Sequence, residues 1–146
     1  MKTKEFIDVF KGSIRVLMNW DRVEKEKWPV EYKVVDLEKL GSLLVPWSAR
    51  GGMSDTERKP FEVSKVAKDL SVVSEKVRLD ILKLSGDMPS DMSPLFPAMK
   101  VGKDILLLDG SHRAVALFLR KVPVSAVVAV MKPKGKRGSW DLEMMT

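Results

Sequence analysis

DILLLDGSHR, at residues 104–113, indicates the fold class of this chain. Residues 105–108 are consecutive large aliphatic side chains, which is typical of a strand buried on both faces. Gly110 predicts a turn after that strand, and the apolar positions of residues 111–120 predict a helix after the turn. A buried strand that leads into a helix in this way predicts an α/β domain.

Apolar runs and turn residues predict four strands, at residues 32–35, 95–101, 104–108 and 122–131. Only Gly102 and Lys103 separate the second strand from the third, and this pair is typical of a hairpin turn. Residues 105–108 and 124–130 are almost continuously apolar. We therefore expect both runs to be interior strands that are covered on both faces.

The helices are predicted from apolar residues at helical spacing and from capping residues. An amphipathic helix opens the chain, although Gly12 disfavours it; its apolar positions are Phe6, Ile7, Phe10, Ile14, Leu17 and Met18. A charged stretch at residues 21–27 follows and ends at Pro29. Three further helices are predicted. The first covers residues 36–40 and ends at Gly41, and the second starts at Pro60 and continues through Phe61, Val66 and Leu70. The third is capped by Ser71 or Ser74 and ends at Gly86.

The length predicts a single compact domain over residues 1–146. With 45% hydrophobic and 32% charged residues, the composition is that of a globular protein. Within the domain we expect a helical N-terminal extension at residues 1–30, a core at residues 32–131, and a basic C-terminal tail at residues 132–146. Residues 46–60 carry the strongest loop signal, because they contain a glycine pair, two prolines and many polar residues.

Residue counts exclude several classes of site and partner. The chain has no cysteine and one histidine, so disulfides, cysteine nucleophiles and zinc sites are excluded, and haem is not expected either. The N-terminus has scattered charges and no long apolar run, so neither a signal peptide nor a membrane span is predicted. We expect a soluble, cytoplasmic protein with no membrane partner. The formal net charge of +6 favours anionic partners.

The turn that begins at Gly110 is the strongest candidate for a binding site. The first backbone N–H groups of a helix lack intrahelical partners and lie at the positive end of the helix dipole, so they attract an anion. Gly110 allows a ligand close to the backbone, and Arg113 offers a guanidinium group matched to phosphate oxygens. Ser111 and His112 add single hydrogen bonds. Asp109, at the carboxyl end of the strand, is placed to hold a metal ion or to accept a proton.

A purely structural interpretation of the same residues stays open. Gly110 is then only a tight turn, and Ser111 is only a helix cap. Arg113 is then only the ion-pair partner of Asp109. His112, the one histidine of the chain, is then a hydrogen-bonded structural residue rather than a catalyst.

A longer stretch resembles a known family. Residues 94–130, PLFPAMKVGKDILLLDGSHRAVALFLRKVPVSAVVAV, are similar to the core of the ParB/sulfiredoxin family. That core has two strands, a glycine-containing turn with an arginine, a helix, and a strand that opens with Val-Pro-Val or a close variant. Residues 34–50, VVDLEKLGSLLVPWSAR, are similar to the first box of the family, with Arg50 as its arginine. The resemblance covers residues 32–131, with the helices at residues 54–86 as a variable insert.

This resemblance implies a mixed sheet flanked by helices, with the phosphates of a nucleotide held by five residues: Gly110, Ser111, His112, Arg113 and Arg50. It does not settle the activity. Sulfiredoxins carry a catalytic cysteine at the position of Ser111, and a serine hydroxyl cannot perform that chemistry, so sulfiredoxin activity is not expected. Related free-serine kinases carry Asp-Gly-His, a polar residue and Arg, and this pattern is the closest in chemistry to residues 109–113.

Three functional hypotheses follow. In the first, the chain is a phosphotransferase or nucleotide hydrolase that uses ATP or CTP with Mg²⁺. Its candidate catalytic residues are Asp109, Ser111 and His112, and Asp109 is also the candidate Mg²⁺ ligand. Asp36 and Glu38 are second candidates for acid–base catalysis.

In the second hypothesis, the chain is a ParB-like nuclease or a DNA-binding protein, and the same turn holds a backbone phosphate. The net charge favours this hypothesis, and so does the basic tail, whose cations include Lys132, Lys134, Lys136 and Arg137. In the third, the domain only binds a partner or a nucleotide signal. The sequence leaves the nucleotide, the acceptor and the oligomeric state open.

Overall fold

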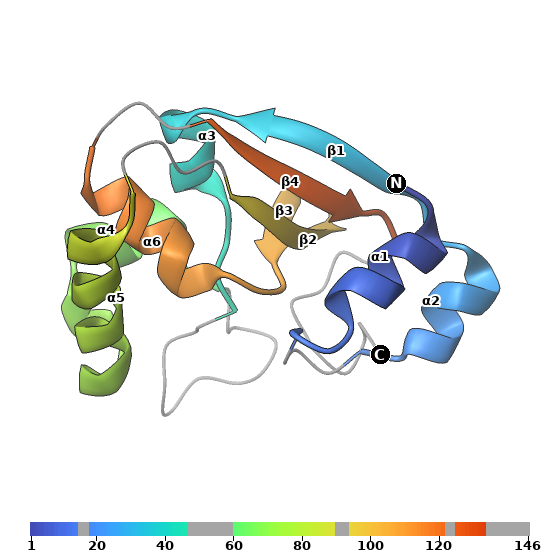
Figure 1. The fold of residues 1–146 in the computed structure, drawn as a ribbon, viewed down its shortest axis with the longest axis horizontal. Helices are drawn as coiled ribbons and strands as arrows, with labels where there is room; N and C mark the ends of the chain where they lie inside the picture. Colours follow the sequence, from blue (N-terminus) through green and yellow to red (C-terminus); the bar gives the residue numbers. More distant parts are fainter. Residues whose placement is uncertain (15–17, 47–59, 90–93, 122–124, 134–146) are drawn as a thin grey trace.

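A four-stranded mixed sheet lies at the centre of the molecule (Figure 1). The structure is a computed structural model that describes residues 1–14, 18–46, 60–89, 94–121 and 125–133. Its strands are β1 (Val30–Val35), β2 (Leu95–Val101), β3 (Asp104–Leu107) and β4 (Ala126–Met131), in the order β1-β4-β2-β3 across the sheet. β4 is parallel to β2, whereas the β1–β4 and β2–β3 pairs are antiparallel. The predicted α/β class with a mixed sheet is confirmed.

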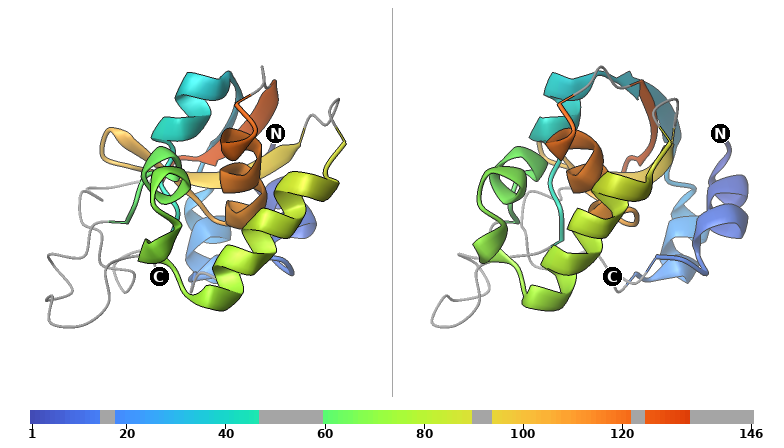
Figure 2. Two further views of the ribbon diagram at one scale, coloured as in Figure 1. Left: turned by 90° about the vertical axis from the view of Figure 1, so that its left-hand side faces the viewer. Right: turned by 60° about the vertical axis from the view of Figure 1, so that its left-hand side comes forward.

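Helices cover both faces of this sheet (Figure 2). On one face lie α1 (Thr3–Phe10) and α2 (Trp20–Glu26). On the other face lie α3 (Leu37–Ser42), α4 (Val63–Lys68), α5 (Glu75–Asp87) and α6 (Ser111–Leu119), with a short 3₁₀ helix, η1 (Leu70–Val72), between α4 and α5.

Alternate residues of each strand enter two separate apolar cores, because successive side chains of a strand point to opposite faces. In β4, Val128 and Val130 enter the core shared with α3, α4, α5 and α6. Ala129 and Met131 enter the core shared with α1 and α2. All four side chains are fully buried. The interior position predicted for this last strand is therefore confirmed.

The place of β3 in the sheet differs from the prediction. An interior strand is predicted at residues 105–108, but β3 is the last strand of the sheet. Leu44 covers its outer edge: the Leu44 N–H donates to the Ile105 carbonyl at 2.9 Å, and the Leu107 N–H donates to the Leu44 carbonyl at 2.8 Å. Leu106 and Leu107 are consequently fully buried, although β3 has a strand neighbour on one side only. The apolar run correctly indicates burial, but it does not indicate a central strand.

The hairpin between β2 and β3 agrees with the prediction. Val101 pairs with Asp104 at its closed end, and Gly102 adopts the left-handed backbone conformation with φ of +61°. Glycine is favoured there because other residues adopt this conformation at a cost.

The predicted N-terminal helix is too long. α1 ends at Phe10, and a turn that contains Gly12 separates it from α2, which occupies most of the charged stretch at residues 21–27. The apolar positions nevertheless predict the core correctly, because Phe6, Ile7, Phe10, Ile14 and Met18 are all buried beneath one face of the sheet.

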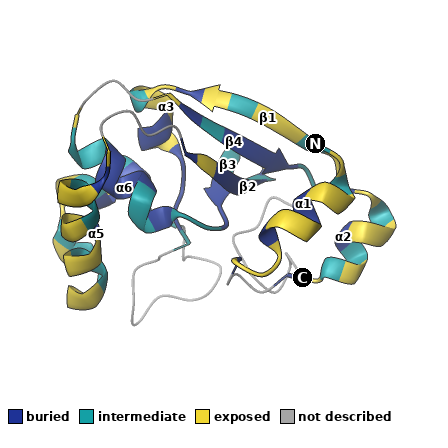
Figure 3. Ribbon diagram, in the orientation of Figure 1, coloured by how far each residue is buried: buried dark blue, intermediate teal, exposed yellow. Residues whose placement is uncertain are grey.

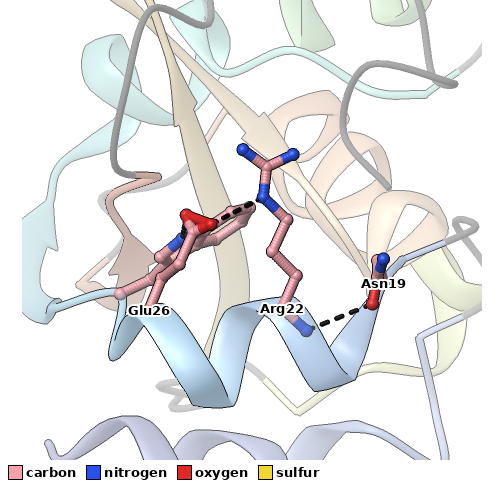
Figure 4. Close-up of polar contacts among 4 residues, drawn as sticks. Asn19, Arg22 and Glu26 are labelled. Carbon is pink, nitrogen blue, oxygen red and sulfur yellow. Dashed lines mark hydrogen bonds and ion pairs between the residues drawn. The ribbon is translucent and has the colours of Figure 1, made fainter.

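Local hydrogen bonds explain why the charged stretch is helical (Figure 4). The Asn19 side chain accepts a hydrogen bond from the Arg22 N–H and caps α2. The Arg22 Nε donates to Glu26 Oε2 at 2.7 Å, an ion pair one helical turn apart. Glu26 Oε1 in turn accepts from the indole N–H of the fully buried Trp28 at 2.9 Å. Glu26 therefore links the end of α2 to the core.

Two glycines that the sequence predicts to end helices lie inside them. Gly41 is buried within α3, and a Cβ added there would lie 2.5 Å from the Phe118 ring, so glycine permits α3 to pack against α6. Gly86 lies within α5, which continues to Asp87. The start of α5 is as predicted, because the Ser74 hydroxyl accepts a hydrogen bond from the Val77 N–H.

The remaining predicted segments have mixed outcomes. α4 begins at Val63 rather than at Pro60. The loop predicted at residues 46–60 lies outside the described residues except for its two ends. None of the helices in the described parts of the chain is long and apolar enough to cross a membrane.

The packing of α5 against α6 predicts opposite outcomes for two neighbouring substitutions. Ile81→Ala should lower the free energy of unfolding by about 2–5 kcal/mol, because Ile81 is fully buried in the core shared with α6. Leu79→Ala on the same helix should change it by less than about 0.5 kcal/mol, because Leu79 is 59% exposed. Urea denaturation monitored by circular dichroism measures both values. Equal effects would contradict this placement of α5.

Candidate functional site

The turn between β3 and α6 is built around Gly110, which is the N-cap of α6. Its φ is +81°, and the Ala114 N–H donates to its carbonyl at 2.9 Å to begin the helix. A Cβ added at Gly110 would lie 2.6 Å from the Phe96 ring of β2. Both the backbone conformation and the contact with Phe96 therefore favour glycine here. The sequence predicts that this glycine admits a ligand close to the backbone, whereas in the structure the Phe96 ring occupies the space that a side chain would take.

The start of α6 has no side-chain cap, because the cap residue is glycine. Ser111 is consequently not the helix cap considered from the sequence. The first N–H groups of α6 point out of the helix end and carry its partial positive charge. An uncapped N-terminus of this kind is suited to an oxygen-rich anion.

Arg113 lies beside this helix end and is half-buried. Its guanidinium carbon is 5.8 Å from the centroid of the Phe96 ring, within the range of a cation–π contact. Among the described residues, no ion pair joins Arg113 to Asp109 or to another carboxylate. The structural interpretation in which Arg113 only pairs with Asp109 is therefore not seen. Instead, Phe96 positions both Gly110 and Arg113.

His112 has a partner that the sequence does not indicate. Its Nδ1 lies 3.9 Å from Asp80 Oδ2, and Asp80 belongs to α5. Both side chains are partly exposed, at 36% for His112 and 50% for Asp80. Asp80 is 32 positions earlier in the chain, so only the packing of α5 against α6 brings it to the turn. No sequence pattern distinguishes it from the other acidic residues of the surface.

The two remaining residues of the turn differ in exposure. Ser111 is only 8% exposed, so its side chain is largely covered by protein. Asp109 is partly exposed and follows Leu108, whose N–H donates to the Pro97 carbonyl at 2.9 Å. The backbone next to Asp109 is thus held at the end of the strand, and the residue itself is partly exposed.

Asp36 and Glu38 are not brought to this turn. Both are exposed at the start of α3, where the Asp36 carboxylate accepts a hydrogen bond from the Lys39 N–H at 2.9 Å and caps the helix. They follow β1, whereas Asp109 follows β3 at the other edge of the sheet. Three strand spacings of about 4.8 Å separate the two ends by roughly 14 Å. Within the described residues, no group of three His, Asp or Glu side chains is arranged to hold a metal ion.

The basic residues predicted to bind phosphate or nucleic acid are mostly outside the described residues, as is the case for Arg50, Lys134, Lys136 and Arg137. Lys132 is described, and it forms an ion pair with Glu31 of β1. The hydrogen bond from Lys132 holds the pKa of the Glu31 carboxyl below its usual value. The ammonium group of Lys132 therefore already has a partner within the chain.

No protein-family model, curated protein or solved structure matches the chain. The resemblance to the ParB/sulfiredoxin family consequently stays a prediction. A binding site at this turn is therefore supported by the geometry of residues 109–113 and Phe96.

Substitutions at three glycines distinguish the two constraints on Gly110, which are its positive φ and its close contact with the Phe96 ring. Gly110→Ala should lower the free energy of unfolding by about 2–4 kcal/mol, from left-handed backbone strain and from overlap with the Phe96 ring. Gly102→Ala should cost only the strain, about 1–2 kcal/mol, because φ is +61° and nothing lies within 4 Å of the added Cβ. Gly86→Ala should stabilise by about 0.5–1 kcal/mol, because it lies in open space within α5.

Chemical denaturation of the three variants under identical conditions measures these differences. If Gly110→Ala cost no more than Gly102→Ala, the close approach of the turn to Phe96 would be wrong.

Proposed function

We propose that the turn of Gly110, Ser111, His112 and Arg113 binds a phosphate group of a nucleotide, and that the chain is a nucleotide-dependent phosphotransferase or nucleotide hydrolase. The observation that carries the proposal is the position of Arg113. Its guanidinium lies beside the uncapped start of α6 and over Phe96, with no carboxylate partner among the described residues. A cation held next to oriented backbone N–H groups is the arrangement that phosphate oxygens prefer.

The residues around the turn divide the chemistry between them. The backbone N–H groups of α6 and the Arg113 fork stabilise the negative charge of the phosphate. His112, whose Nδ1 lies 3.9 Å from Asp80 Oδ2, is the candidate proton acceptor of the turn. Phosphoryl transfer depends mainly on positioning and charge stabilisation, and these are the contributions that the groups of the turn would make.

Asp109 is the residue that would hold Mg²⁺ beside the bound phosphates. Magnesium ions that accompany nucleotides are held by one or two carboxylates together with the phosphates, so the partly exposed Asp109 fits this role by itself. When bound, Mg²⁺ supplies neutralisation of phosphate charge. Without it, the Asp109 carboxylate repels the same phosphates.

The proposed nucleotides are ATP or CTP, as the resemblance implies. The alternative, a ParB-like nuclease or DNA-binding protein, is favoured by the net charge of +6 and by the basic tail. Of the tail's candidate cations, Lys132 is paired with Glu31, and Lys134, Lys136 and Arg137 lie outside the described residues. The cytoplasmic location stays a prediction.

Arg113→Ala should weaken nucleotide binding by a factor of about ten to a hundred, because a charge-assisted hydrogen bond contributes roughly 1.5–3 kcal/mol. Arg113→Lys should restore the affinity only in part, because an ammonium group cannot form the bidentate fork. Isothermal titration with ATP, CTP and inorganic phosphate, each with and without Mg²⁺, measures the affinities.

Arg120→Ala is the matched control on the same helix segment. Arg120, the C-cap of α6, donates to the Met88 carbonyl at 2.7 Å and to the Pro89 carbonyl at 3.4 Å, so its loss should lower the melting temperature and leave nucleotide affinity unchanged. If Arg113→Ala behaved like Arg120→Ala, the turn would have only a structural role.

Asp109→Asn should remove both proposed effects of the carboxylate, which are the repulsion of phosphate in the absence of Mg²⁺ and the binding of Mg²⁺. Nucleotide binding without Mg²⁺ should become tighter than in the original chain, because the repulsion is removed, and added Mg²⁺ should no longer improve it. Asp104→Asn, at the other end of β3, serves as the control and should retain the Mg²⁺ effect. An undiminished Mg²⁺ effect in Asp109→Asn would exclude Asp109 as the ligand.

A further inference from the structure

The outer edge of β1 is open in the part of the chain that the structure describes. β1 is the first strand of the sheet, and no described segment pairs with the side that faces away from β4. It runs along the margin of the molecule in Figure 1, and Figure 3 shows exposed residues along it. Open edges are protected in most proteins, since unpaired N–H and C=O groups invite another strand.

The hydrogen bonds to β4 determine which residues of β1 present these groups. The Lys132 N–H donates to the Pro29 carbonyl at 2.8 Å, so this pair is hydrogen-bonded. Hydrogen-bonded and non-hydrogen-bonded pairs alternate along an antiparallel ladder, so Glu31 and Lys33 also bond to β4. The backbone groups of Val30, Tyr32 and Val34 therefore point outward.

The sequence of this edge is self-complementary. Residues 30–34 read Val-Glu-Tyr-Lys-Val, with Tyr32 in the middle and opposite charges on its two sides. If a second copy pairs antiparallel with a two-fold axis at Tyr32, Val30 lies opposite Val34, and Glu31 lies opposite Lys33. Outward-pointing residues then meet only outward-pointing residues, as the ladder requires.

Neighbouring registers of the same pairing are less favourable. A shift that keeps the outward residues opposed but centres the axis on Glu31 places two glutamates opposite each other. Centring it on Lys33 places two lysines opposite each other. Like charges directly opposite destabilise a sheet, so only the register centred on Tyr32 combines charge pairing with the longest ladder.

We propose that a second copy of this chain docks on the β1 edge, with antiparallel β1–β1 pairing and a two-fold axis at Tyr32, so that one sheet continues through both protomers. Val34 is 67% exposed and Tyr32 is 49% exposed in the single chain, and both become covered in part. The two Tyr32 side chains meet across the axis on one face of the sheet. On the opposite face, the partner's Lys33 reaches Glu31, whose Oε2 contacts Lys132.

Charge reversal tests the pairing by sedimentation equilibrium of the full chain. The unmodified chain should dimerise. Glu31→Lys alone and Lys33→Glu alone should each weaken the dimer at least about tenfold, because two symmetry-related pairs become repulsive. An equal mixture of these two variants should form heterodimers, because each Lys then faces a Glu. Glu75→Lys makes the same change of charge on α5, away from β1, and should leave the dimer intact.

Single cysteines test the register, because the chain has no cysteine of its own. In the proposed pairing, Glu31 of one protomer lies opposite Lys33 of the partner subunit in a non-hydrogen-bonded pair. The Cα atoms of such a pair are about 4.5 Å apart, within disulfide range. A mixture of Glu31→Cys and Lys33→Cys chains should oxidise to the heterodimer, identified by mass, several-fold faster than either chain alone. A chain that stays monomeric up to about 1 mM, single reversals without effect, or no preference for the heterodisulfide would each overturn the proposal.

Discussion

Both faces of β4 are buried, and this constraint determines the roles of the other elements. Val128 and Val130 require a helical layer on one side, which α6 and its neighbours supply. Ala129 and Met131 require a second layer, which α1 and α2 supply from the N-terminal 26 residues. The N-terminal extension is therefore part of the domain core rather than an appendage. Glu26 and the buried Trp28 fix this layer to the sheet.

The candidate site depends on the same packing. Phe96 is a fully buried residue of β2, and its ring lies against both Gly110 and the guanidinium of Arg113. The strand that carries Phe96 is held between β4 and β3, so the ring cannot move away without disturbing the sheet. Core packing thus fixes the distance between the start of α6 and the Arg113 side chain. A preorganised cation beside a helix N-terminus loses little entropy when it binds an anion.

The sequence predicts the segments in which local signals and tertiary packing agree. The predictions of a hairpin turn at Gly102 and of a turn into a helix at Gly110 are confirmed. Both turns need a residue with positive φ, and glycine in the sequence is a local signal for that conformation. The prediction that Gly41 ends a helix is wrong, because the constraint at this position is the Phe118 ring, 77 positions later in the chain. Asp80 was missed for a related reason: only the contact of α5 with α6 brings it near His112.

The central position predicted for β3 fails for a different physical reason. Continuous apolar residues report that both faces of a strand are covered, but they carry no information about its hydrogen-bonded edges. Here Leu44, from the segment after α3, occupies the outer edge and completes the burial. β1 shows the opposite combination, with exposed residues on both faces and no described partner on its outer edge.

The candidate site and the proposed dimer contact lie at opposite edges of the sheet. The turn at Gly110 follows β3, at one margin of the sheet, whereas the β1–β1 contact lies at the other margin. In a sheet that continues through two protomers, the two turns would lie at the outer ends, on opposite sides of the two-fold axis. Neither turn would contribute a residue to the other. The proposed dimer and the proposed phosphate binding should therefore be independent of each other, since the β1 contact would leave the Phe96–Gly110 packing unchanged.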